Sequence, residues 1–308
     1  MAASLAWRVR RYRNRQRLQV PASEVEARLG VPAGRRPAES LVIPAVGTAY
    51  VEEGALAAHF AERFCPELRE IVIASDLPAS AFPSLPSKAR VATIDVSALM
   101  PRAHAYLAIY RSRLVKLLAP RQAAFERVLM TDSDLVLLRP VAIPFPEGCV
   151  MGNFRRGKMI SKVRRAGLPA PPELAGTYRP YLWDHLNGAF LAATRSTWDK
   201  LSPAWLAAFI GIWSKLPDNQ PPTDQLPLCC ALDHLGLATV DLGPWVNWPV
   251  SKAIGGRSAS IPPEVIGAHG GFPLSEWRRY LDDPRTALKF VGQSESRKLR
   301  YPKDAEAG

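Results

Sequence analysis

Two aspartates separated by one residue lie at the end of an apolar run in the stretch VLMTDSDLVLL. Asp132 and Asp134 follow Val128, Leu129 and Met130, which have the character of a buried strand. On an extended backbone, residues i and i+2 point to the same side, so the two carboxylates are expected to lie close together. They repel one another unless a cation lies between them. Such oxygen ligands suit Mg²⁺ or Mn²⁺, whose coordination is commonly completed by substrate phosphates.

The alternative interpretation of this stretch is a surface turn, because Asp and Ser are common in turns. The context favours a site, since apolar residues flank the acids on both sides. In open α/β sheets, ligands bind outside the carboxyl ends of the strands. The sequence therefore predicts a metal and anion site at Asp132, Ser133 and Asp134.

Strands alternate with helices along the chain, which predicts a largely parallel sheet covered by helices on both faces. The expected strands are residues 41–47, 70–76, 90–96, the stretch before the two aspartates, 149–154, 186–194 and 238–243. The expected helices are residues 51–64, 104–120, 196–214 and 224–236. Residues 155–186 are rich in Arg, Lys and Pro and are expected to form a long loop or lid. Their basic side chains favour either an anionic acceptor or a solvated surface.

The composition is that of one globular α/β domain, with 308 residues of which 47% are hydrophobic. The formal net charge of +12 favours an anionic partner without choosing among nucleic acid, lipid and nucleotides. The four cysteines include no CxxC pair, which indicates reduced, buried thiols in a cytoplasmic protein. No apolar run approaches the ~18 residues of a membrane-spanning helix.

Residues 1–39 form a separate basic segment, in which six arginines fall within positions 8–17. Leu5, Val9 and Tyr12 give a weak apolar face at helical spacing. Two interpretations stay open: a basic helix on an anionic membrane surface, and a solvated N-terminal helix. The segment lacks the apolar centre of a secretory signal. The expected location is therefore the cytoplasm, with peripheral attachment to the inner membrane face as the membrane-bound option.

Five motifs in the chain resemble, in their order, those of A-type-fold nucleotide-sugar glycosyltransferases, and within them glycosyltransferase family 8. They are YRSRLVKLLAP, RVLMTDSDLVLLRP, LNGAFLAAT, TDQLPL and GAHGGFP, between residues 40 and 275. The resemblance implies a single Rossmann-like nucleotide-diphospho-sugar transferase domain with a mostly parallel mixed sheet. We assign the catalytic domain to residues 40–300 and a tail to residues 301–308.

The resemblance also implies roles for individual residues. Asp132, Asp134 and His269 would hold the metal, and an imidazole ligand suits Mn²⁺ better than Mg²⁺. Ser133 and Arg113 would lie beside the donor. For His269 a structural loop histidine is the alternative, and for Arg113 a solvated helix arginine.

Four further residues would surround the donor sugar according to the same resemblance. Asn187 and Gly188 would lie beside the sugar, although an Asn-Gly pair is also common in turns. Asp224 and Gln225 would lie near the sugar hydroxyls and the anomeric carbon. Helix capping by Thr223 and Asp224 is the alternative, and the two roles are compatible.

The chain departs from the family pattern at two places. Leu226 stands where the family usually has another Asp, and no Lys follows the His-Gly motif at the usual spacing. Arg278, Arg279 and Lys252 are the candidates to replace that lysine. These departures leave the donor sugar open.

The function expected from this resemblance is hexosyl transfer from a nucleotide sugar, most simply a UDP-sugar, to a glycan or lipid-linked acceptor. The resemblance implies retention of configuration, which the residues alone leave open. A sugar nucleotidyltransferase is the second hypothesis, but LVIPAVGTAYVEEGALA lacks the glycine-rich, lysine-containing signature of many such enzymes. A nucleic-acid-binding protein is the third, and neither an aromatic-basic RNA signature nor zinc-finger spacing supports it.

Overall fold

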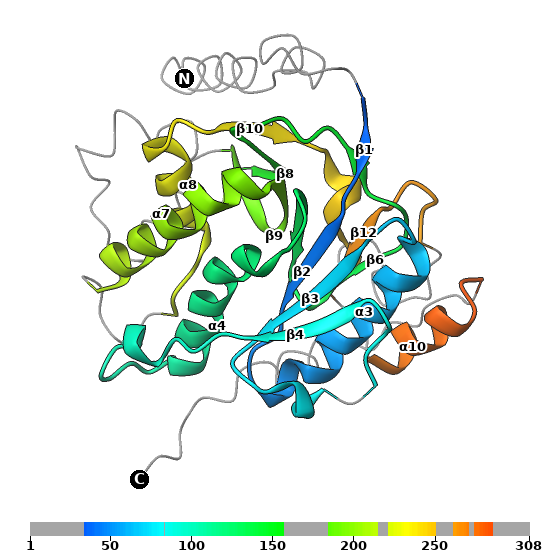
Figure 1. Ribbon diagram of the computed structural model, residues 1–308, viewed down its shortest axis with the longest axis horizontal. Coiled ribbons are helices and arrows are strands. Elements are labelled where there is room, and N and C mark those ends of the chain that lie inside the picture. Colours follow the sequence, from blue (N-terminus) through cyan, green and yellow to red (C-terminus); the bar gives the residue numbers. More distant parts are fainter. Residues whose placement is uncertain are drawn as a thin grey trace, which may run out of the picture.

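A computed structural model of the chain describes residues 34–82, 84–156, 184–214, 221–250, 261–270 and 274–285. Seven strands form a central sheet in the spatial order β10, β8, β9, β5, β2, β3 and β4 (Figure 1). Their bounds are β2 (Ser40–Pro44), β3 (Glu70–Ser75), β4 (Ala89–Thr93), β5 (Arg127–Thr131), β8 (Cys149–Arg156), β9 (Asp184–Thr194) and β10 (Ala238–Asp241). Strand β9 runs antiparallel to both β5 and β8, and the other neighbours are parallel. This mixed, mostly parallel sheet confirms the expected Rossmann-like α/β fold.

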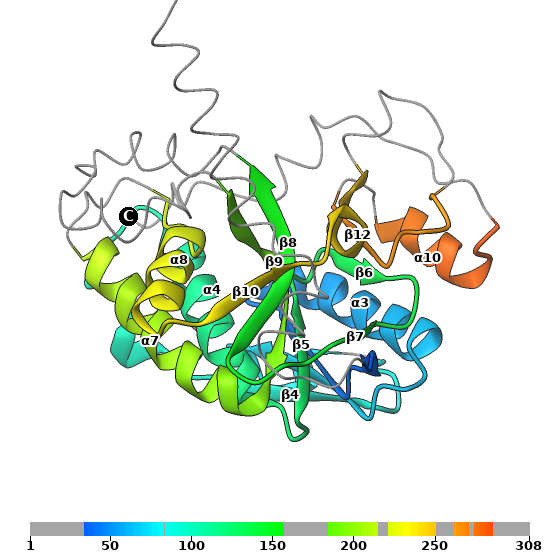
Figure 2. The same ribbon diagram turned by 90° about the horizontal axis from the view of Figure 1, so that it is seen from above.

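Helices cover both faces of this sheet, as the two views show (Figures 1 and 2). One face carries α4 (Leu107–Leu118), α7 (Arg195–Trp213) and α8 (Gln225–His234), and the other carries α3 (Val51–Phe64) and, beyond it, α10 (Leu274–Asp282). Val42 and Val72 pack in the core beneath α4 and α7, whereas Leu41, Ile43 and Ile73 pack with α3. Because both faces are buried, β2 and β3 are nearly continuous apolar runs rather than alternating ones.

The chain reverses its direction of travel across the sheet at β2. After β2 it adds β3 and β4 on one side, and it then returns to place β5 on the other side. Strands β2 and β5 are parallel, with Val42 opposite Met130, so their carboxyl ends lie at the same edge. This is a topological switch point, where ligands of open α/β sheets bind. The residues that leave β5 here are Asp132, Ser133 and Asp134.

A three-stranded sheet lies beside this edge and consists of β6 (Leu135–Leu137), β12 (Gly267–His269) and β11 (Trp248–Pro249). Strand β12 pairs antiparallel with β6, which places His269 opposite Leu135. Phe60 of α3 and Trp277 of α10 pack against this sheet, with their rings edge to face at 5.6 Å between centroids. The small sheet thus places His269, which comes late in the chain, next to the turn that follows β5.

Short elements complete the described part of the chain. Strands β1 (Arg36–Pro37) and β7 (Ala142–Ile143) pair antiparallel. The 3₁₀ helices are η1 (Thr48–Tyr50), η2 (Ala79–Ala81), η3 (Ser97–Leu99), η4 (Ala119–Gln122) and η5 (Pro244–Asn247). All four cysteines are buried thiols, and burial raises the pKa of Cys149 to about 12. Among the described residues, none of the helices combines the length and apolar character that a membrane span requires.

The expected helices and strands are confirmed to within a few residues at their ends, and two expectations are wrong. Residues 132–134 are not extended, because they form a turn in which the Leu135 N–H donates to the Asp132 carbonyl at 3.1 Å. Residues 155–186 are not wholly irregular, since β8 continues to Arg156 and β9 begins at Asp184. The rest of that loop, the basic segment of residues 1–33 and the C-terminal tail lie outside the described residues.

Candidate functional site

Main-chain hydrogen bonds from two other segments hold the turn that carries the acids. The Asp132 N–H donates to the Ala189 carbonyl of β9 at 3.0 Å. The Gly270 N–H donates to the Asp134 carbonyl at 2.8 Å, so the end of β12 is tied to the turn directly. The Ser133 hydroxyl lies 3.4 Å from a carboxylate oxygen of Glu53 in α3. The backbone of the turn is therefore fixed before any ligand binds.

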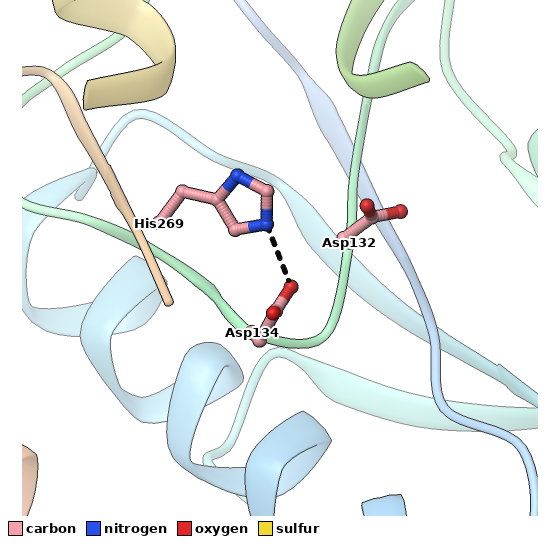
Figure 3. A group of neighbouring side chains, drawn as sticks. All are labelled: Asp132, Asp134 and His269. Carbon is pink, nitrogen blue, oxygen red and sulfur yellow. Dashed lines mark ion pairs between the residues drawn. The ribbon is translucent and has the colours of Figure 1, made fainter. Parts of the chain in front are cut away.

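Asp132, Asp134 and His269 form a cluster of potential metal ligands (Figure 3). Each offers one ligand atom, and these atoms lie within 4.8 Å of one another. His269 Nε2 is 3.1 Å from Asp134 Oδ1, which is the spacing of neighbouring ligands around an octahedral ion with bonds of ~2.1 Å. The side chains are 18–26% exposed, so an ion can reach them from solvent. Two carboxylates and one imidazole fit a divalent cation such as Mn²⁺ or Mg²⁺.

Lys116 explains why the Asp132 carboxylate turns away from the His269 ring in Figure 3. Its Nζ atom lies 2.6 Å from Asp132 Oδ1 and 2.6 Å from Asp224 Oδ2. The lysine side chain is only 4% exposed. Burial alone would lower the pKa of Lys116, but the two carboxylates raise it above the ordinary value. The ammonium therefore joins the turn after β5 to the start of α8.

Lys116 was not among the site residues predicted from the sequence, although a signal for it was present. The lysine interrupts the apolar run LVKLL on α4, where Leu114, Val115 and Leu117 are buried. A lysine within such a run is buried only if carboxylates pair with it. Arg113, which had been matched to the donor site, lies one turn earlier and contributes to the same electrostatic field.

The capping interpretation is confirmed for Thr223 and wrong for the side chain of Asp224, which makes no capping hydrogen bond. Its carboxylate pairs with Lys116, and the Thr223 hydroxyl instead accepts a hydrogen bond from the Gln225 N–H at 3.3 Å. Burial would raise the pKa of Asp224, but the attraction of Lys116 and Arg113 holds it below its usual range. The main-chain carbonyl of Asp224 accepts a hydrogen bond from the Trp205 indole at 2.9 Å. This residue is therefore an ionised, anchored carboxylate.

Asn187 and Gln225 meet beside this ion pair. The Gln225 Nε2 donates to Asn187 Oδ1 at 3.1 Å, and both residues are buried. Gly188 lies against the same group, because a Cβ atom there would be 3.1 Å from Asp224 Oδ2 and 3.3 Å from Lys116 Nζ. Asn187 and Gly188 are thus part of β9 rather than of a turn.

A pocket of about 420 Å³ opens at the switch point, which is within the usual range for small-molecule sites. Its lining includes five of the expected site residues, namely Arg113, Asp132, Ser133, Asp134 and His269, together with Lys116. The end of β2 and the turn after it, Tyr50, Tyr106 and three further residues of α4 form the rest of its wall. Asn187, Gly188, Asp224 and Gln225 do not line the pocket and lie buried behind Lys116.

Two of the three candidates for the lysine that the resemblance leads us to expect do not line this pocket. Arg278 of α10 pairs with Glu52 of α3 at 3.2 Å, and Arg279 pairs with Glu276 within α10 at 2.7 Å. Neither arginine lines the pocket, and Lys252 lies outside the described residues. Among the residues that do line it, Lys116 and Arg113 are the cations.

Comparisons with known proteins give similarities in structure and none in sequence. No protein-family model matches the chain, and no curated protein matches its sequence. The chain is similar to the apo structure of the WbbM bifunctional glycosyltransferase, with a TM-score of 0.45 and 15% sequence identity. The similarity covers 71% of this chain and 40% of that chain. This chain therefore corresponds to less than half of that protein.

Proposed function

We propose that this chain is a metal-dependent glycosyltransferase. It would move a sugar from a nucleoside diphosphate, most simply a UDP-sugar, to a glycan or lipid-linked acceptor. The observation that supports this proposal is the meeting of two clusters at one sheet edge. The metal-ligand cluster of Asp132, Asp134 and His269 lies in the pocket, and Lys116 links it to Asp224 and its neighbours.

The proposed roles of the residues in the pocket follow from their charges. A divalent ion held by Asp132, Asp134 and His269 would supply positive charge to the diphosphate leaving group. Lys116 and Arg113 add fixed positive charge on the same side of the pocket. Charge that is already in place stabilises the negative charge that develops as the glycosidic bond breaks.

The opposite charge develops on the sugar, whose transition state resembles an oxocarbenium ion. Asn187 and Gln225 are the neutral polar groups that the family resemblance assigns to this charge, although neither lines the pocket. The Gln225 amide nitrogen donates to Asn187, and a carboxamide oxygen is the kind of atom that can stabilise a cationic centre. The Asp224 carboxylate is engaged by Lys116 and is not placed as a free nucleophile. Retention of configuration is proposed from the family resemblance alone, and it would then proceed by front-face attack of the acceptor.

The test is a panel of nucleotide sugars with Mn²⁺, in which released nucleoside diphosphate is measured. We expect release with one donor class, its loss on adding EDTA, and the best recovery with Mn²⁺. Asp134→Asn should weaken metal and donor binding while leaving the melting temperature unchanged, because the residue lies in a surface-facing turn. In a separate assay with a nucleoside triphosphate and a sugar 1-phosphate, release of pyrophosphate would instead indicate nucleotidyl transfer. Full activity in metal-free protein would refute the metal assignment.

A further inference from the structure

The His269 ring is held at both of its nitrogen atoms. Nε2 faces Asp134 Oδ1 at 3.1 Å, and Nδ1 lies 2.8 Å from Asn247 Oδ1. A neutral imidazole binds a metal through the nitrogen that carries no proton, so its other nitrogen must carry one. The partner of Nδ1 therefore decides whether Nε2 is available.

Asn247 occupies a rigid position relative to His269. It is the last residue of η5, and the next strand, β11, pairs with β12 so that Pro249 lies opposite His269. The Ile266 N–H donates to the Trp245 carbonyl at 2.9 Å. At Gly267 a Cβ atom would collide with the Val246 carbonyl oxygen, so glycine permits this close approach of η5 to β12.

The Asn247 side chain is buried, at 4% exposure. Its Nδ2 atom has no hydrogen-bond partner in the part of the chain that the structure describes. The contact with His269 is therefore the interaction that orients this amide. An amide turned the other way would donate to Nδ1 and force the proton onto Nε2, beside Asp134.

We infer that Asn247 is a positioning residue that prepares His269 to bind the metal. Its Oδ1 atom accepts the Nδ1 proton, so that Nε2 is the nitrogen left to bind an ion held together with Asp134. Outer partners of ligating histidines commonly act in this way, and their loss typically lowers metal affinity ~10–100-fold. The inference rests on the metal site of the proposed function and adds a residue that the metal itself does not touch.

Mn²⁺ binding to the purified full-length chain, measured by electron paramagnetic resonance without donor, tests this role. We expect Asn247→Leu to weaken Mn²⁺ binding ~10–100-fold. Asn247→Asp should retain binding at least equal to wild type, because a carboxylate can only accept the Nδ1 proton. The matched control is Asn153→Leu, since the Asn153 amide bonds to the Gly243 carbonyl at 3.0 Å just before η5 and does not contact His269. It should bind Mn²⁺ as wild type does.

A spectroscopic readout separates tautomer control from a general loss of structure. In the metal-free protein, ¹⁵N chemical shifts of His269 should show less of the Nδ1–H tautomer in Asn247→Leu than in wild type. Asn247→Ala serves if the leucine variant does not fold. Unchanged Mn²⁺ affinity in a folded variant, or a loss in Asn247→Asp as large as in Asn247→Leu, would overturn the inference. Absence of Mn²⁺ binding in wild type would instead refute the proposed metal site, on which the inference rests.

Discussion

At the scale of single residues, the Lys116 ammonium is the buried charge on which the inner part of the site depends. Lys116→Met leaves the Asp224 carboxylate buried without its partner at 2.6 Å. Breaking a buried pair on one side typically costs ~3–5 kcal/mol. We expect a loss of that order in the free energy of unfolding, measured by urea denaturation. The double variant Lys116→Met with Asp224→Asn should recover much of it. Losses that simply add in the double variant would contradict the pairing.

Gln225 is the residue at which structural and catalytic roles can be separated. Its bond to Asn187 is buried and neutral, so Gln225→Ala should reduce stability by ~0.5–1.5 kcal/mol. If its oxygen also stabilises charge in the transition state, kcat should fall ~10²-fold with donor affinity nearly unchanged. Donor affinity, melting temperature and kcat are measured on the same variant. An unchanged kcat with a lowered melting temperature would assign the residue a purely structural role.

At the scale of elements, the site depends on the close approach of β9 to α4 and α8 at Gly188. A Cβ atom in Gly188→Ala would press on both members of the Lys116–Asp224 pair, at 3.3 and 3.1 Å. Such overpacking typically costs ~1–3 kcal/mol, and we expect a loss of that size in urea denaturation. Gly211→Ala in α7 is the control, because no atom lies within 4 Å of its Cβ position. That change should stabilise the helix by ~0.5–1 kcal/mol. Equal effects at the two glycines would contradict the packing argument.

The elements of the main sheet were predictable because their signals are local. Strands β2, β3 and β5 are apolar runs bounded by polar or turn residues, and α3 has an apolar face over 14 residues. Strand β12 has only three residues, and its identity comes from pairing with β6 across more than 120 residues of chain. Local sequence patterns do not predict pairing between strands so far apart in the chain. The small sheet and α10 were accordingly missed.

The candidate site shows the same contrast between local sequence signals and contacts that are distant in sequence. Asp132 and Asp134 are recognisable because their type and spacing appear in one stretch. The partners Lys116 and Asn247 are defined by contacts with residues distant in sequence, at 2.6 and 2.8 Å. The wrong expectation of an extended Asp132–Asp134 segment has a related cause. The turn forms because the chain leaves the main sheet after β5, and β6 then pairs with β12 in the small sheet. That pairing joins segments that are distant in sequence.

At the scale of the whole molecule, the positive charge is unevenly distributed. The described residues contain 20 Lys and Arg against 21 Asp and Glu, whereas the whole chain has a formal net charge of +12. The excess of basic residues therefore falls in sequence that lies outside the described part, including residues 1–33 and 157–183. The described residues together are nearly neutral, so the net attraction of the chain for polyanions would come from the sequence outside them.

The N-terminal segment provides the sharpest test of that distribution. Six arginines within positions 8–17 motivate the hypothesis of peripheral attachment to an anionic membrane surface. Each basic residue near such a surface contributes ~1 kcal/mol, and salt screens the attraction. We expect deletion of residues 1–20 to reduce sedimentation with vesicles containing phosphatidylserine while sparing donor hydrolysis, because the pocket is built from residues beyond 40. Replacing the six arginines with glutamine in the full-length chain is the matched control and should have the same effect. Raising the salt concentration should release the wild type. Equal sedimentation of the full-length and truncated proteins would rule out this attachment and leave the solvated segment as the correct interpretation.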